Sequence, residues 1–212
     1  NLIISNRNCV KALTEYFKKR EDTIHLLLKN LKKTNPPSFY HKLRVEIKKL
    51  NAILDLIEFS SKNFKRKKTF KPIKIIFRQA GKVRELQIEE SILKKYFISG
   101  VLKNYRQNLH DLISNEQIIF YSTLNESDIT QLKKAFKNIN RHVMEIKSEL
   151  AERYLKKLRN KVNNILKQKK LKIAELHELR KFLKIYYYNL TALGHDKKKD
   201  ILSSEEILLH RL

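Results

Sequence analysis

The stretch from His41 to Ile57 has the apolar spacing of an amphipathic α-helix, and this pattern constrains the fold more than any other feature of the chain. On a helix that turns about 100° per residue, one side collects the apolar residues Leu43, Ile47, Leu50, Leu54 and Ile57. A second stripe is cationic, because side chains three and four residues apart share a face, and it holds His41, Arg44 and Lys48. The stretch therefore predicts a helix with an apolar back and a cationic front.

The same device returns 136 residues later, from 41 to 177, where His177, Arg180 and Lys184 repeat the H-x-x-R-x-x-x-K spacing. Apolar residues again lie behind the cations, at Leu179, Leu183, Tyr186 and Leu190. For one such motif, a solvated helix face with a structural histidine is the ordinary interpretation. Its repetition favours a shared function for the two helices.

Few residues in this chain break helices, since 212 residues include only 3 Gly and 3 Pro. No segment alternates apolar and polar residues long enough to predict a strand, so we expect an all-α fold. The expected helices cover about 6–33, 38–60, 72–81, 86–113, 128–168 (as one bent helix or two) and 172–193, with a last short one capped by Ser203 or Ser204. Ser38 is the expected N-cap of the second helix. Gly81 either ends the third helix or lets another backbone approach closely, and residues 114–128 form the expected seam between two halves.

The chain is strongly basic, with 47 Lys and Arg against 22 Asp and Glu and a formal net charge of +25. An excess of this size favours a polyanionic partner: a nucleic acid, an anionic membrane or a phosphate polymer. No apolar run is long enough to span a membrane, and the first residues are too short an apolar stretch for a secretion signal. Cys9 is the only cysteine, so no internal disulfide can form and a cytoplasmic location is expected.

The residues give little support for an enzyme. Each motif histidine shares its face with Arg and Lys rather than with other metal ligands, and no nucleophile elbow or glycine-rich phosphate loop is present. We therefore predict no catalytic residues, no metal ligands and no cofactor. Arg and Lys do suit phosphate oxygens, and further cations extend the candidate site: Lys49, Lys74, Arg78, Arg84 and Lys181. Two such helices facing each other would form a channel that admits a thin chain of phosphates but not a nucleic-acid duplex.

Three motifs in order resemble the CHAD family, the conserved histidine α-helical domain. The family's first signature, H-x-L-R-V-x-x-K/R-K/R-L-R, is matched by His41, Leu43, Arg44, Val45, Lys48, Lys49 and Leu50. A second, L-R-x-L-x-x-x-L-G-x-x-R-D-x-D-V, is followed by Ile73, Lys74, Ile76, Gly81, Arg84, Glu85, Leu86 and Ile88. The second-half copy of the histidine motif is met by His177, Leu179, Arg180 and Lys184.

The resemblance implies a helical bundle of two pseudo-symmetric halves, here 1–114 and 115–212, around a basic central pore. The second half is expected to be incomplete, because the sequence stops near the point where the family's next helix pair begins. The resemblance also implies non-catalytic binding of inorganic polyphosphate by His41, Arg44, Lys48, Lys49, Lys74, Arg78, Arg84, His177, Arg180, Lys181 and Lys184. Polyphosphate or polyester storage granules are implied partners. Two alternatives stay open: a basic nucleic-acid-binding protein, which is the less favoured partner class, and an enzyme acting on polyphosphate.

Overall fold

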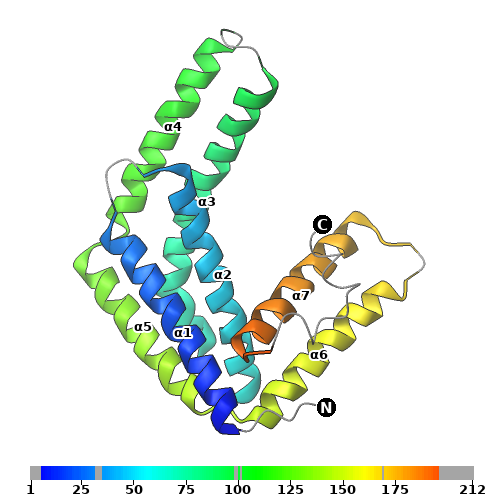
Figure 1. Cartoon of the computed structure of the whole chain (residues 1–212). Helices are drawn as coiled ribbons and strands as arrows, with labels where there is room; N and C mark the ends of the chain where they lie inside the picture. Colours follow the sequence, from blue (N-terminus) through cyan, green and yellow to red (C-terminus); the bar gives the residue numbers. More distant parts are fainter. Residues whose placement is uncertain (1–5, 32–34, 98–99, 101, 169, 196–212) are drawn as a thin grey trace. The chain divides into compact units, whose positions relative to one another are not determined.

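All regular secondary structure in the part of the chain that the structure describes is α-helical. The structure is a computed structural model, and it describes residues 6–31, 35–97, 100, 102–168 and 170–195. Within them lie seven helices (Figure 1): α1 (Asn6–Lys29), α2 (Pro37–Ser60), α3 (Arg66–Tyr96), α4 (Lys103–Ser122), α5 (Glu126–Met144), α6 (Ser148–Leu166) and α7 (Ile173–Ala192). The all-α prediction is confirmed.

The helices group into two compact units. One unit, called the His41 unit below, consists of residues 21–48 and 67–138; the other, the His177 unit, consists of residues 1–20, 49–66 and 139–212. Each histidine motif thus belongs to a different unit. The predicted division into halves at residue 114, with its pseudo-symmetry, concerns repeats along the chain and stays a prediction.

Aromatic and aliphatic side chains from the five helices α1 to α5 fill the core of the His41 unit. The ring centroids of Tyr40 and Phe120 lie 5.3 Å apart in an edge-to-face contact, and Phe39 packs against both rings. Helices α3 and α4 run side by side as a hairpin (Figure 1). Near its turn, Arg106 of α4 donates hydrogen bonds to the carbonyls of Leu93 and Phe97, at 3.2 and 3.0 Å. These carbonyls lie at the end of α3 and just beyond it, so Arg106 fastens α4 to the end of α3.

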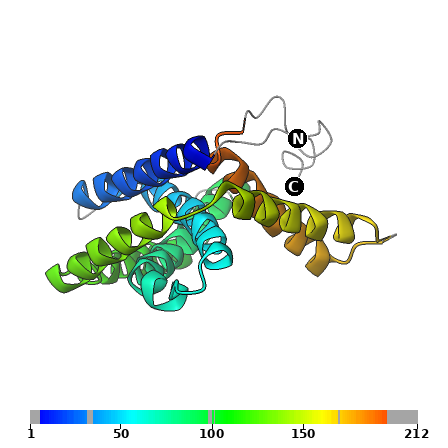
Figure 2. The same ribbon diagram turned by 90° about the horizontal axis from the view of Figure 1, so that it is seen from below.

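In the His177 unit, α6 and α7 form a second helical hairpin, whose two helices lie side by side in both views (Figures 1 and 2). Val162, Leu179 and Leu183 are its buried apolar centre. The buried amide of Asn189 donates to the carbonyl of Ala52 at 3.2 Å and so ties α7 to the second half of α2. Burial of the leucine stripe and this long-range hydrogen bond together fix which face of α7 carries the motif cations.

The third predicted helix does not end at Gly81. Helix α3 continues through this residue to Tyr96, so the predicted break between 81 and 86 is wrong. The break lies instead between α3 and α4, where Gly100 and Leu102 have positive φ angles of 104° and 61°. A glycine inside a helix weakens it by about 1 kcal/mol relative to alanine, and the sequence pattern therefore suggested an end. The reason that Gly81 is tolerated lies in its neighbour on α2, described below.

Of the two alternatives for residues 128–168, the structure has two helices, α5 and α6. Two other boundaries differ from the predictions. Helix α4 runs through the expected seam as far as Ser122. Pro37, not Ser38, begins α2, as suits a residue without an N–H group in the first turn. The side-chain oxygen of Asn125 accepts from the backbone N–H of Asp128 at the start of α5. The expected short helix near Ser203 lies outside the described residues.

Candidate functional site

The first histidine motif lies in α2 with the burial that its spacing predicts. Its apolar stripe is no more than 1% exposed at any position, which confirms the apolar back formed by Leu43, Ile47, Leu50, Leu54 and Ile57. His41 and Lys48 are exposed on the other stripe, and Arg44 between them is half-buried. Arg44 therefore differs from its two neighbours, because part of its side chain is covered by another element.

That element is α3. The guanidinium of Arg44 lies over the ring of Phe77, with its Cζ atom 4.2 Å from the ring centroid, and Nη1 donates to the Phe77 carbonyl at 2.8 Å. Stacking of this kind adds a cation–π attraction to the hydrogen bond. One turn further along α3, a Cβ atom on Gly81 would overlap Nη1 of Arg44. Gly81 thus makes room for a side chain of α2 rather than for a turn of its own helix.

The guanidinium of Arg44 has lost part of its hydration, so binding an anion there would be favourable. Burial lowers the pKa of Arg44 from its ordinary value, and the charge of Glu85 on α3 opposes that shift. An arginine nevertheless stays protonated at any pH at which a protein is folded. The guanidinium is a fork of several donors, and one hydrogen bond, to Phe77, is found for it among the described residues. An anion placed at the open edge of this fork would compensate the lost hydration.

The remaining predicted cations of this region lie on α3. Lys74 and Arg78 are exposed and Arg84 is half-buried. Lys74 lies three residues before Phe77, and Arg78 and Arg84 lie three residues before and after Gly81, so the three lie toward the side of α3 that Arg44 contacts. Together these residues form what we call the His41 cluster: His41, Arg44, Lys48, Lys74, Arg78 and Arg84. Lys49, one position further along α2, is half-buried and belongs by sequence to the His177 unit.

The second motif lies in α7. Leu179 and Leu183 behind it are 1% and 2% exposed, as predicted, whereas Tyr186 is only half-buried. We call the cations of this face the His177 cluster: His177, Arg180, Lys181 and Lys184. Lys184 is half-buried and the others are exposed. Burial and, after it, the charge of Arg180 lower the pKa of Lys184. Two like charges are thus held together one turn apart on a partly dehydrated surface.

Lys181 also interacts electrostatically with a carboxylate. Asp55 of α2 lies within its electrostatic reach, but this acid is already paired with Arg66, whose Nη2 donates to Oδ1 at 2.6 Å. Arg66 donates in addition to the side-chain oxygen of Asn51 at 3.0 Å and lies 3.4 Å from Glu58. Arg66 lies in a run of basic residues, which usually forms a solvent-exposed surface. Its structural role here is instead to pair with the carboxylate of Asp55.

Sequence reasoning missed Phe77, the platform on which Arg44 rests. An aromatic residue four positions before a glycine, on a helix that pairs with a cationic one, is the signal that could have found it. The predicted pore between the two motif helices concerns their relative placement and stays a prediction. Across the described ranges, no helix is long and apolar enough to cross a membrane, and no group of three His, Cys, Asp or Glu side chains could hold a metal ion.

Comparison with known proteins gives a consistent result. The family model of the CHAD domain matches residues 10–201. Among solved structures, the crystal structure of the CHAD domain from the plant Ricinus communis is similar with a TM-score of 0.75 at 11% identity, over 95% of this chain and 72% of that one. No curated protein matched the sequence. At 11% identity the structural likeness shows the fold, and the family match covers most of the chain.

Proposed function

The chain belongs to the CHAD domain family, and from that membership we propose that it binds inorganic polyphosphate on the cationic faces of α2, α3 and α7 without acting on it chemically. The family is known in general for binding polyphosphate. The finer proposal concerns this chain: its ligand is held by the His41 and His177 clusters, which line the predicted basic pore.

The main support for this proposal is the position of Arg44 against Phe77. Stacking on Phe77 and the hydrogen bond to its carbonyl fix the plane of the guanidinium, so the fork is oriented before a ligand arrives. Orientation in advance lowers the entropy lost on binding. Phosphate oxygens match the spacing of guanidinium donors, and Lys74, Arg78 and Arg84 on the same side of α3 offer successive contacts to a chain of phosphates.

The cations of α7 support the same ligand in a different way. Arg180 and Lys184 repel each other in the free protein, and a polyanion between them would convert that repulsion into attraction. Lys, with its mobile point charge, suits a flexible phosphate chain. His41 and His177 would donate hydrogen bonds to further phosphate oxygens. A linear anion with charge at every unit uses both kinds of contact.

The test replaces one arginine in each cluster. We expect the variant Arg44→Ala/Arg180→Ala to bind long-chain polyphosphate roughly 10- to 100-fold more weakly, because each lost charged hydrogen bond is worth about 1 kcal/mol or more. The matched control is Arg153→Ala/Arg159→Ala, which removes the same charge from exposed positions of α6. Isothermal titration calorimetry measures both. Equal affinity of the two variants would show that net charge, rather than these clusters, binds the ligand.

Nucleic-acid binding is the competing function, and the net charge of +25 favours it. Helix α6 adds exposed cations of its own, at Lys156, Lys157, Arg159 and Lys161, and exposed Lys167 follows directly after it. Competition separates the two functions: single-stranded DNA of equal charge should fail to displace polyphosphate from the wild-type protein. Displacement at equal concentrations would favour the nucleic-acid function. Release of orthophosphate or shortening of the chain with Mg²⁺ present would instead indicate an enzyme.

A further inference from the structure

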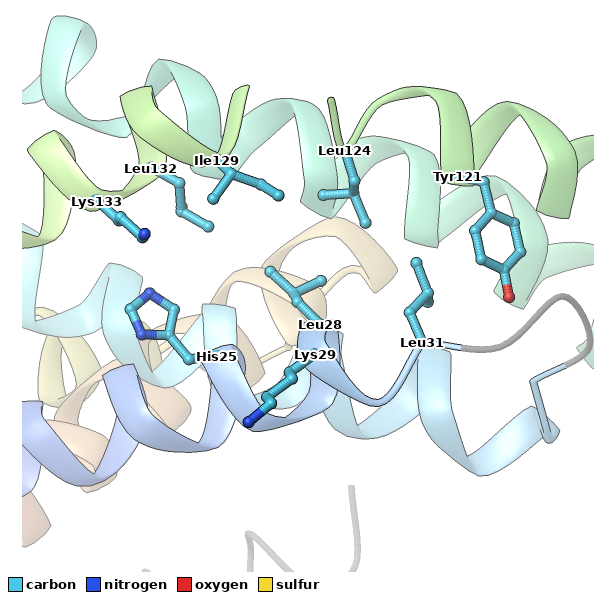
Figure 3. Close-up of a pocket in the computed structure, with 9 residues that line it drawn as sticks. All are labelled: His25, Leu28, Lys29, Leu31, Tyr121, Leu124, Ile129, Leu132 and Lys133. Carbon is cyan, nitrogen blue, oxygen red and sulfur yellow. The ribbon is translucent and has the colours of Figure 1, made fainter. Parts of the chain in front are cut away.

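An apolar pocket with cationic side chains at one end lies in the His41 unit, away from the residues of the His41 cluster. Its volume is about 490 Å³, within the range of small-molecule sites, roughly 300–1,000 Å³. Helix α1 forms one wall, and the end of α4 with the start of α5 forms the other (Figure 3). Its apolar lining consists of Leu28, Leu31, Leu124, Ile129 and Leu132.

The polar groups of the pocket are separated from one another. Figure 3 shows Lys133 and His25 at one end and Tyr121 at the other, with the aliphatic side chains between them. Lys29 contributes a second ammonium from α1. The lining contains no Asp or Glu, so its charged end is uniformly positive.

His25 adds an independent observation. Its Nε2 atom is buried and has no hydrogen-bond partner, while its ring packs edge to face on Phe136 with centroids 5.1 Å apart. A buried polar nitrogen without a partner costs free energy, and a ligand oxygen at the charged end of the pocket would remove that cost. Tyr121 at the opposite end is already engaged, since its hydroxyl accepts from the amide of Asn35 at 3.1 Å.

We propose that this pocket binds a small amphiphilic anion of the fatty-acid class. The alkyl chain would lie among the leucines and Ile129, and the carboxylate would lie at the end that holds His25 and Lys133, accepting a hydrogen bond from His25, while the charge of Lys29 adds to the attraction. Ile129 is 40% exposed, so the pocket is open to solvent on the α5 side and a ligand can enter without unfolding. Polyphosphate has no apolar part and does not match this lining, which gives the chain a second ligand class.

Decanoate is the probe, and isothermal titration calorimetry with amide NMR shifts is the measurement. We expect decanoate to shift amides of α1 and the α4–α5 region, and long-chain polyphosphate to leave it bound. Lys29→Gln/Lys133→Gln should weaken binding about five- to tenfold, as loss of two partly exposed ion pairs predicts. The control Lys134→Gln/Lys137→Gln removes two exposed lysines of α5 that do not line the pocket and should bind as the wild type does.

A charge reversal keeps the test sharp. Lys29→Glu/Lys133→Glu should lose decanoate and gain decyltrimethylammonium, which has a similar tail and the opposite charge. Both positions are exposed on helices, so the fold should persist, and circular dichroism checks it. The proposal is overturned if decanoate does not bind, if its amide shifts map to α7 instead, or if the control variant weakens binding as much as the pocket variant.

Discussion

Arg44 and Gly81 share one volume: the guanidinium of Arg44 on α2 fills the space beside α3 that a side chain on residue 81 would need. The same guanidinium donates to the carbonyl of Phe77 at 2.8 Å. The absence of a Cβ atom in one helix therefore determines the position of a cation in another.

Gly81→Ala should separate binding from stability. The new methyl group would push the flexible end of Arg44 aside, so polyphosphate affinity should fall about as far as in Arg44→Ala. Stability should change little, because alanine favours the helix by about 1 kcal/mol and that gain offsets the lost contact. Calorimetric binding and thermal unfolding measure the two effects. In the Arg44→Ala background the Gly81 substitution should have no further effect on affinity, and an additive loss would contradict the mechanism.

Lys184→Met should weaken polyphosphate binding without lowering stability at neutral pH. Burial and Arg180 lower the pKa of Lys184 below 10.5, so the charged form is disfavoured in the folded state. In the wild type, stability from this position therefore rises as the pH passes upward through the folded-state pKa toward 10.5. The variant should lose that rise and should melt at the same or a higher temperature at pH near 7. Lys181→Met, next to Asp55, is the control that should not stabilise the protein; a lower melting temperature for Lys184→Met would refute the argument.

Arg66→Met should destabilise the His177 unit by about 1–3 kcal/mol, because it leaves the carboxylate of Asp55 without its main partner. Burial already raises the pKa of Asp55, and Arg66 opposes that shift. The stability that a raised carboxyl pKa contributes is present at low pH and is lost as the pH rises through the folded-state value. The defect should therefore shrink in acid, where Asp55 is protonated. Urea unfolding at several pH values measures it, with Lys65→Met as control and Asp55→Asn/Arg66→Met as the rescue.

The salt dependence of polyphosphate binding should show how many phosphates the protein neutralises. For single-stranded nucleic acids, the slope of log affinity against log salt becomes more negative by about 0.7 for each neutralised phosphate, and we apply the same value to polyphosphate. Arg44→Ala/Arg180→Ala should therefore reduce the slope by about 1.4, whereas Arg153→Ala/Arg159→Ala should leave it unchanged. Titrations at four or more salt concentrations are sufficient to distinguish the two variants. Parallel lines for the wild type and the first variant would mean that these arginines do not touch the ligand.

Cys9 should be unreactive in the folded protein. Its side chain is 1% exposed, and burial, with a smaller effect of Glu152, raises the pKa of the thiol to about 11. Since the thiolate is the reactive form, a disulfide reagent at pH near 8 should label Cys9 only after denaturant is added. Rapid labelling of the native protein would show that the first part of α1 opens readily.

Helical periodicity predicted much of the fold because burial follows it so closely. The leucine and isoleucine stripe from Leu43 to Ile57 is buried as expected, and the fold class followed from such stripes. What the pattern could not provide was the partner of each face. The role of Gly81, the platform on Phe77 and the pairing of Arg66 with Asp55 are contacts between segments far apart in sequence. From the sequence alone, Gly81 suggests the end of a helix. The contact with Arg44 explains why a glycine lies inside α3 instead.

The close approach of Arg44 to residue 81 also has an evolutionary consequence. Within the family, the two positions should vary together: a chain that replaces the arginine with a shorter residue frees its glycine to become alanine or serine, whereas the same change in a chain that keeps the arginine would displace the guanidinium. If the two positions vary independently among relatives, the placement of Arg44 beside Gly81 is specific to this sequence.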